Sequence, residues 1–253
     1  MKTVFARTPY QGVVQIVLFN RRFYLVGAVG TVIAINASLF LPRRMSLTMM
    51  ACALPLIFWL ASSLIVSHYV YDRSSIYEFN WLSQVIPRTP TAWVNIHCGF
   101  DEISHTLVAK FPGANFQTLD IFDPQVMTEP SISIARRIKS FPVHAAAAHY
   151  DALPCASGSF EAAFLFFAAH ELRRHDQRVL LFKEVARIVM PGGSIILVEH
   201  ARDLWNFLAF GPGAFHFFSQ RVWRSATFEA GLIVHSHRSI TPFVHVYSLR
   251  KIA

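Results

Sequence analysis

Two stretches near the middle of the chain decide its fold. The first is Leu153–Phe164, which reads LPCASGSFEAAF, and the second is Glu184–Ser194, which reads EVARIVMPGGS. The first leads into an apolar run typical of a buried strand at 161–167. The second closes a helix predicted at 175–190, where Pro-Gly-Gly provides a stop signal, and leads into a strand at 193–199. The apolar face of that helix consists of Val179, Phe182, Val185, Ala186 and Val189.

The same alternation of strands and helices extends on both sides of these stretches. Such alternation predicts a parallel sheet covered by helices on both faces, a doubly wound α/β fold with seven mostly parallel strands. The predicted strands are 92–97, 116–121, 143–148, 161–167, 193–199, 231–237 and 243–250. The predicted helices are 102–110, 130–140, 175–190 and one near 217–230.

The part of the chain before this domain has a different character. Residues 23–41 and 47–71 contain no Asp, Glu, Lys or Arg. Each is long enough, at about 1.5 Å per helical residue, to cross a hydrocarbon core of roughly 30 Å. The five-residue linker between them predicts a transmembrane helical hairpin. The expected organisation is a tail at 1–22 with an apolar segment suited to the membrane surface, the hairpin at 23–71, an amphipathic connector at 72–91 and the α/β domain at 92–253.

The distribution of charge supports a membrane partner over a nucleic acid. The formal net charge is +8, but residues 1–71 carry six basic and no acidic side chains, and the rest is nearly balanced, with 17 basic and 15 acidic. Basic flanks orient membrane helices and contact anionic headgroups, so no nucleic acid is expected. Four of the six basic residues lie in the tail, which predicts a multi-pass protein of a bacterial-type inner or cytoplasmic membrane with its main domain in the cytoplasm.

The two central stretches resemble motifs of the class I S-adenosylmethionine-dependent methyltransferases, especially the branch that includes ubiquinone- and menaquinone-biosynthesis enzymes. Leu153-Pro154 with Gly158–Phe164 is similar to the family's LP…GSFD strand, and Glu184–Ser194 to its E…RVLKPGG helix and turn. The Glu199-His200 pair at the end of the next strand adds to the likeness. The resemblance covers about 92–250 and implies a Rossmann-like methyltransferase fold with S-adenosylmethionine as cofactor.

The resemblance also implies where the cofactor would bind. The family's first strand ends in a D-x-G-x-G-x-G turn, which aligns here with Asn95–Asp101; only Gly99 keeps a glycine, while His97 and Asp101 replace the other two. A Cβ obstructs the close approach of backbone to ligand that those glycines allow. Asp101 is alternatively the N-cap of the next helix.

Two further residues complete the expected cofactor site. Asp120 ends the second strand and matches the acidic residue that binds ribose hydroxyls, with Asp123 as the competing candidate. His149 stands where the family often has an acidic residue for adenine. Basic residues on the helix at 130–140, including Arg136, are expected to form a solvated face.

Histidines follow four of the predicted strands. They are His97, His149, His170 and His200. Strand ends are where ligands bind in open α/β sheets, and a histidine can act as a general base near neutral pH. His170 with Glu171 is the preferred catalytic pair, His170 as base and Glu171 as its orienting partner. For each histidine alone, a structural hydrogen-bonded role is the alternative. No local ligand spacing supports a metal site, so none is predicted.

The segment Trp205–Trp223 is rich in aromatic residues and follows the strand at 193–199. One interpretation is a channel for a hydrophobic substrate. The other is a segment that packs against the transmembrane hairpin. We therefore expect a membrane-anchored methyltransferase acting on a lipid-like or prenylated small molecule. The alternatives are a non-catalytic subunit or scaffold of a membrane protein complex with this fold, favoured by the loss of glycines, and a different small-molecule reaction at the histidine-rich edge.

Overall fold

The computed structural model describes residues 7–137 and 144–252 of the chain. These residues form two compact units. The hairpin unit comprises the chain up to Ser74 together with Asp203–Phe215, and the sheet unit comprises Ser75–Arg202 together with the chain from His216. The connector predicted at 72–91 is therefore divided between the units, and most of it belongs to the sheet unit.

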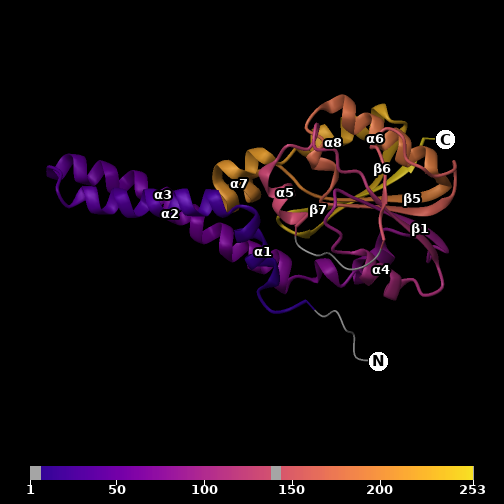
Figure 1. Ribbon diagram of the computed structural model, residues 1–253, viewed down its shortest axis with the longest axis horizontal. Helices are drawn as coiled ribbons and strands as arrows, with labels where there is room; N and C mark the ends of the chain where they lie inside the picture. The colour runs from indigo at the N-terminus through magenta and orange to yellow at the C-terminus, as the bar shows by residue number, and fades with distance from the viewer. Residues whose placement is uncertain (1–6, 138–143, 253) are drawn as a thin grey trace. The chain divides into compact units, whose positions relative to one another are not determined.

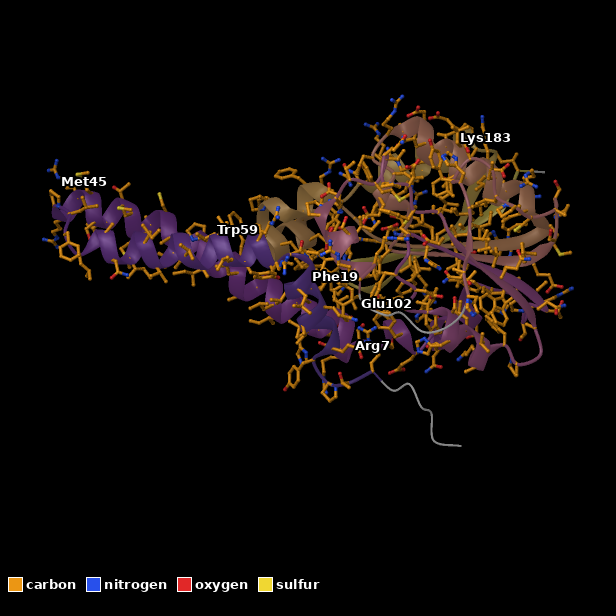
Figure 2. The ribbon with its side chains drawn as sticks, in the orientation of Figure 1. Arg7, Phe19, Met45, Trp59, Glu102 and Lys183 are labelled. Atoms are coloured by element: carbon orange, nitrogen blue, oxygen red, sulfur yellow. The ribbon has the colours of Figure 1, made fainter. Side chains whose placement is uncertain are left out.

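The hairpin unit is built from helices α1 (Gln11–Phe19), α2 (Arg21–Ser38) and α3 (Arg43–His68), continued by the π-helix η1 (Tyr69–Arg73). Helices α2 and α3 pack along each other, joined by the short turn that the sequence predicts (Figure 1). Figure 2 shows Met45 near the tip of this hairpin, with side chains projecting outward along both helices. Many of these side chains are apolar and exposed, among them Val26, Ile33, Leu54 and Ile65.

One carboxylate fixes the start of α1 against the end of the hairpin. The Oδ1 and Oδ2 atoms of Asp72 accept hydrogen bonds from the backbone N–H groups of Gly12, at 2.5 Å, and Val13, at 3.1 Å. A helix N-terminus leaves such groups unsatisfied, and a negative charge there is favourable. A Cβ at Gly12 would lie 2.3 Å from Cβ of Tyr71, so this contact requires glycine.

Membrane-spanning capacity is concentrated in α3 and its continuation. Among the described residues, one helical stretch, Arg43–Tyr77, is long and apolar enough to cross a membrane, with mean hydropathy 2.2. Helices α1 and α2 are bent by 81° to each other and make a second candidate only when counted together as one span.

The segment after the fifth strand belongs to the hairpin unit. Helix α7 (Leu204–Phe210) packs against α3, where the rings of Phe207 and Trp59 are 5.7 Å apart. Gly211, at φ +55°, ends α7, and a Cβ there would lie 2.5 Å from the Trp59 ring. The close contact of backbone and indole thus depends on glycine. Of the two predictions for this segment, packing against the hairpin is the one that this contact matches.

The sheet unit contains one seven-stranded sheet in the order β3-β2-β1-β4-β5-β7-β6. Strands β1 to β5 pair in parallel, and β7 pairs antiparallel with both β5 and β6. The strands are β1 (Ala92–His97), β2 (Asn115–Asp120), β3 (Ala146–Ala147), β4 (Phe160–Phe166), β5 (Val189–His200), β6 (Leu232–Thr241) and β7 (Val244–Lys251). The helices are α4 (Ser104–Lys110), α5 (Pro130–Ala135), α6 (His175–Ile188) and α8 (Gln220–Glu229). The short helices are η2 (Ser75–Tyr77), η3 (Asn80–Gln84), η4 (Ala169–Glu171) and η5 (Gly211–His216). Helix η5 is divided between the two units.

Both faces of the sheet are covered, which explains why its strands are almost continuously apolar. Figure 1 shows α6 and α8 over one face and α4 over the other. Alternate residues of β1 divide between the faces, so that Trp93 stacks on Phe116 while Val94 joins Phe182 in the main core. The connector aromatics Phe79 and Trp81 are also buried, with Phe79 against Phe166.

The predicted fold class of the sheet unit is confirmed, a mixed seven-stranded Rossmann-like sheet. One boundary differs: α6 ends at Ile188, and Pro-Gly-Gly lies inside β5. There it forms a bulge, because the six residues of β5 from Val189 to Ser194 lie opposite the three residues of β4 from Phe160 to Ala162. A Cβ at Gly193 would lie 2.8 Å from the Glu161 carbonyl oxygen. The predicted helix at 130–140 and strand at 143–148 partly lie outside the described residues.

An ion pair at the end of α6 holds the loop before β4. Arg187 and Glu184 form two short contacts, with nitrogen–oxygen distances of 2.8 Å and 2.7 Å. The same guanidinium donates to the carbonyl oxygens of Leu153 and Cys155, and Glu184 accepts from the Leu153 N–H group. The acid and the arginine of the E…RVLKPGG motif are thus joined to the LP motif.

Replacing Arg187 with Met should destabilise the sheet unit, because the loop carbonyls and Glu184 lose charged hydrogen bonds worth about 2 kcal/mol in total. We expect the thermal unfolding midpoint to fall by about 4–8 °C for a unit of this size. The matched control is Arg174→Met, because Arg174 also pairs with an acid of α6, Asp176, but in an exposed position. That change should move the midpoint by less than about 2 °C. Equal shifts for the two variants would contradict the structural role of Arg187.

Candidate functional site

The carboxyl ends of the parallel strands form one edge of the sheet, and most of the predicted site residues lie along it. The β1–β2 register places His97 beside Asp120. Immediately after β4, Phe167 adopts φ 50°, a left-handed conformation that is rare for an aromatic residue. This turn directs the chain into η4, which carries His170 and Glu171 beside the end of β5.

His170 is held by the buried carboxylate of Glu199, near the end of β5. Its Nδ1 lies 2.8 Å from Oε2 of Glu199, and its backbone N–H donates to Oε1 at 3.2 Å. Glu199 is 1% exposed, so the negative charge depends on these partners. Glu171 was expected to orient this ring; Glu199 contacts its Nδ1, and Glu171 lies at its Nε2.

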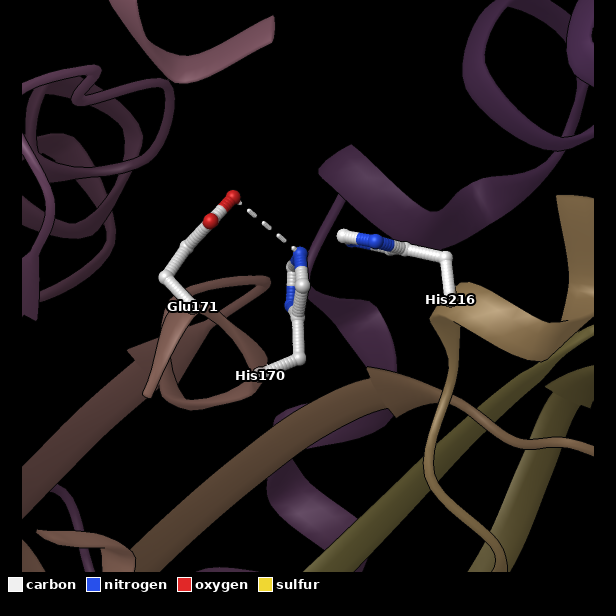
Figure 3. Close-up of side chains that lie close together, drawn as sticks. All are labelled: His170, Glu171 and His216. Carbon is white, nitrogen blue, oxygen red and sulfur yellow. Dashed lines mark ion pairs between the residues drawn. The ribbon is translucent and has the colours of Figure 1, made fainter. Parts of the chain in front are cut away.

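Glu171 and His216 approach the other side of the His170 ring (Figure 3). Oε1 of Glu171 is 3.4 Å from Nε2 of His170. The ring of His216, the last residue of η5, meets the His170 ring edge-on with centroids 5.2 Å apart. Cluster A is defined here as His170, Glu171 and His216.

The charges around cluster A separate the pKa values of its two histidines. Burial alone would lower the pKa of His170, but the Glu199 charge and the hydrogen bonds of Glu171 and Glu199 outweigh it and raise the pKa to about 10. Burial, together with the charges of His170 and Arg173, lowers the pKa of His216 to about 4. Although burial raises the pKa of Glu171, contact with His170 leaves it below its usual value. With both carboxylates beside it, His170 keeps its proton at neutral pH, which does not favour its predicted role as a base.

The Gly99 turn after β1 is tight and is covered by an arginine. Gly99 has φ +86°, and a Cβ there would lie 1.6 Å from Nη1 of Arg136. That guanidinium donates to the Cys98 carbonyl at 3.3 Å and to Oδ2 of Asp120 at 2.7 Å. Arg136 therefore does not belong to the purely solvated face expected from the sequence.

The two residues that replace family glycines have structural contacts. His97 is buried, its Nδ1 accepts a hydrogen bond from the Gly99 N–H at 2.9 Å, and burial lowers its pKa. Asp101 is buried, and its Oδ1 accepts from Asn95 and from the backbone N–H groups of Ile103 and Ser104 at the start of α4. Asp101 thus contacts the backbone at the start of α4, but the N-cap residue of this helix is Ile103, not Asp101 as the alternative interpretation expected.

The remaining histidines are apart from cluster A. His149 is half-exposed and contacts Asp151 and, at 3.5 Å, Asp123. His200 stacks between Phe167 and Phe217, and its Nδ1 is 2.8 Å from the Phe243 carbonyl oxygen. For His200 the structural alternative describes the observed contacts.

Gly99 and Asp120 fit a bound S-adenosylmethionine. The positive φ and absent Cβ at Gly99 allow a close approach to the backbone, in the space that the Arg136 guanidinium occupies here, and Asp120 lies at the end of the adjacent strand. The carboxylate of Asp120 uses one oxygen for the Phe122 N–H and the other for Arg136. Because a carboxylate has about four acceptor positions, two remain for ribose hydroxyls.

Sequence reasoning missed three residues of this edge: Arg136, Glu199 as the partner of His170, and His216. The Glu199-His200 pair was visible at a strand end, which is the signal that could have suggested a partner for His170. His216 lay within the aromatic segment, and Arg136 is 16 residues from Asp120 in the chain. No local pattern pairs either one with its neighbour.

Comparisons with known proteins agree with the geometry. Residues 95–197 match the family described as "Methyltransferase domain". No curated protein matches the sequence.

Among solved structures, human N-acetylserotonin methyltransferase in complex with SAM is 14% identical, with a TM-score of 0.56 over 99% of this chain and 72% of that one. A protein from Pyrococcus horikoshii is 12% identical, with a TM-score of 0.51 over 70% of this chain and 89% of that one. A SAM-dependent methyltransferase from Methanosarcina mazei is 16% identical, with a TM-score of 0.49 over 68% and 97%. The matched domain covers residues 95–197, and the two structures with TM-scores above 0.5 share the fold of the sheet unit.

Proposed function

We propose that the chain is a membrane-anchored S-adenosylmethionine-dependent methyltransferase that acts on a lipid-like or prenylated small molecule. The observation that carries the proposal is the position of the chain connections between its two units. All three occur at the carboxyl edge of the sheet, where cluster A and the Gly99 turn lie.

Each connection can be located on the sheet unit. After Ser74, Tyr77 packs on Phe166, the last residue of β4, with ring centroids 5.6 Å apart. The chain leaves the sheet unit at Arg202, two residues after β5 ends. It returns at His216, which contacts His170. The exposed apolar side chains of the hairpin unit support an acceptor that is itself apolar.

The exposed apolar surface of the hairpin unit supports the membrane anchor. Large exposed apolar surfaces mark contact with protein or lipid, and the most apolar 18-residue window of the α3 stretch is only 11% buried. We propose that α2 and α3 cross an inner or cytoplasmic membrane and that the sheet unit faces the cytoplasm, as the basic tail predicts.

The site residues have distinct proposed roles. When bound, S-adenosylmethionine supplies an electrophilic methyl group from its sulfonium. Asp120 holds the ribose hydroxyls and the Gly99 turn the methionine end, which positions the cofactor. Glu171, which lies 3.4 Å from Nε2 of His170, lines the space proposed for the acceptor. His170, fixed by Glu199, lines the same space.

Replacing Asp120 with Asn should weaken binding of S-adenosylmethionine by about 10–100-fold, because charged hydrogen bonds to the ribose are lost. Isothermal titration of the full chain in detergent measures this. Asp123→Asn is the matched control, a nearby acid that was the competing candidate, and should bind within about twofold of the wild type.

Two outcomes of this titration have different meanings. Absence of S-adenosylmethionine binding to the wild-type chain up to millimolar concentration would overturn the proposed function. Binding that survives Asp120→Asn unchanged would refute the assignment of the ribose site to Asp120.

The membrane anchor can be tested with the natural cysteines. Cys52 is nine residues after the first residue of α3, about 14 Å along the helix, and is exposed. In isolated membranes it should resist a water-soluble maleimide, because the thiolate that reacts does not form in hydrocarbon, and it should react after detergent is added. Partly exposed Cys155 on the sheet unit is the internal control in open membranes. Equal labelling of Cys52 before and after detergent would contradict the anchor.

A further inference from the structure

Cluster A combines two imidazoles and one carboxylate at a single point. One nitrogen of His170, one nitrogen of His216 and one oxygen of Glu171 all lie within 4.8 Å of one another. Figure 3 shows the three side chains converging from η4 and from the end of η5. Imidazole nitrogen and carboxylate oxygen are the ligands of many divalent transition-metal sites. We propose that His170, Glu171 and His216 bind a divalent transition-metal ion such as Zn²⁺.

The spacing of the ligand atoms suits such an ion. With metal–ligand bonds of about 2.1 Å, two ligands of a tetrahedral site are about 3.4 Å apart. Nε2 of His170 and Oε1 of Glu171 are 3.4 Å apart. The His216 nitrogen lies within 4.8 Å of both atoms.

A buried acceptor without a partner provides an independent indication of a ligand. Glu171 is only 8% exposed, and its Oε2 atom is inaccessible to solvent. This oxygen has no hydrogen-bond partner among the described residues. Leaving a carboxylate oxygen buried and unsatisfied is costly, and a bound cation removes that cost.

The surroundings hold His170 as metal-binding histidines are usually held. A ligating imidazole commonly donates its other ring N–H to a carboxylate, which fixes the ring and its tautomer. Glu199 is in that position, at Nδ1 of His170, and a bound ion would take the place of the Nε2 proton that faces Glu171.

Arg173 joins the two segments that carry the ligands. Its Nη1 donates to the backbone carbonyl oxygens of His170 at 3.2 Å and His216 at 2.7 Å. The guanidinium also lies over the Phe218 ring, 4.5 Å from its centroid. The ligand-bearing loops are thus held together by a residue that does not itself belong to the cluster.

Three protein ligands leave a coordination position open, as in catalytic rather than structural metal sites. An acceptor oxygen bound there would lose its proton more readily and become a better nucleophile for a methyl group. This catalytic role rests on the proposed function, whereas the binding of the ion does not.

The test uses the untagged full chain in detergent, freed of metal with a chelator and titrated with Zn²⁺. We expect one ion per chain. Glu171→Gln, which changes one atom, and His216→Ala should each raise the dissociation constant at least 10-fold, and Glu199→Gln about 10–100-fold. Co²⁺ in place of Zn²⁺ should give a visible absorption band in the wild type that both ligand variants lose.

His149→Ala is the matched control, because His149 lies near two aspartates at the same edge of the sheet and should leave Zn²⁺ binding unchanged. Thermal unfolding of each metal-free variant checks that it folds. Less than stoichiometric binding by the wild type, or binding that Glu171→Gln leaves intact, overturns the proposal. Titration of S-adenosylmethionine into the metal-free wild type separates the metal site from the methyltransferase function. If S-adenosylmethionine does not bind, only the methyltransferase function is refuted.

Discussion

Parallel pairing of β1, β2, β4 and β5 is the constraint on which the arrangement of the candidate site depends. Parallel strands in register all end at one edge, so residues far apart in sequence come together without any local signal. The carboxyl ends of β1 and β2 bring the Gly99 turn to Asp120. Those of β4 and β5 bring His170 to Glu199. The same edge receives every crossing between the units.

Element order and type were predictable because they depend on local patterns. The covered sheet makes its strands apolar, and the Glu184–Arg187 pair accounts physically for two motifs that the family resemblance treats as signatures. The end of α6 was less predictable. Pro-Gly-Gly is a stop signal for a helix, but the same residues also permit a bulge in which Gly193 meets a neighbouring strand.

The site was predictable only as a set of positions. His170 and Asp120 could be placed at strand ends, whereas the partner of each depended on tertiary contacts. Arg136 pairs with Asp120, and Glu199 lies 29 residues from His170. In the sequence, Asp101 stands where the family has a glycine of its ligand-binding turn. In the structure, its carboxylate accepts a hydrogen bond from the backbone at the start of α4. A glycine of a turn motif can therefore be replaced by a residue that binds the start of the next helix, while a strand end nearby keeps an acidic residue such as Asp120.

The segment Asp203–Phe215 has a consequence for how the protein is made. It interrupts the sheet unit in sequence, yet its helix α7 completes the hairpin unit by packing on Trp59. Strands β6 and β7 are synthesised only after it, so neither unit has all its parts until the ribosome has passed residue 215. Long-range pairing of this kind slows folding. A fragment that starts at Ser75 would contain α7 but not α3. Phe207 would then lose its contact with the Trp59 ring, and α7 would lose the helix against which it packs. Completing each unit therefore requires segments that lie far apart in the sequence.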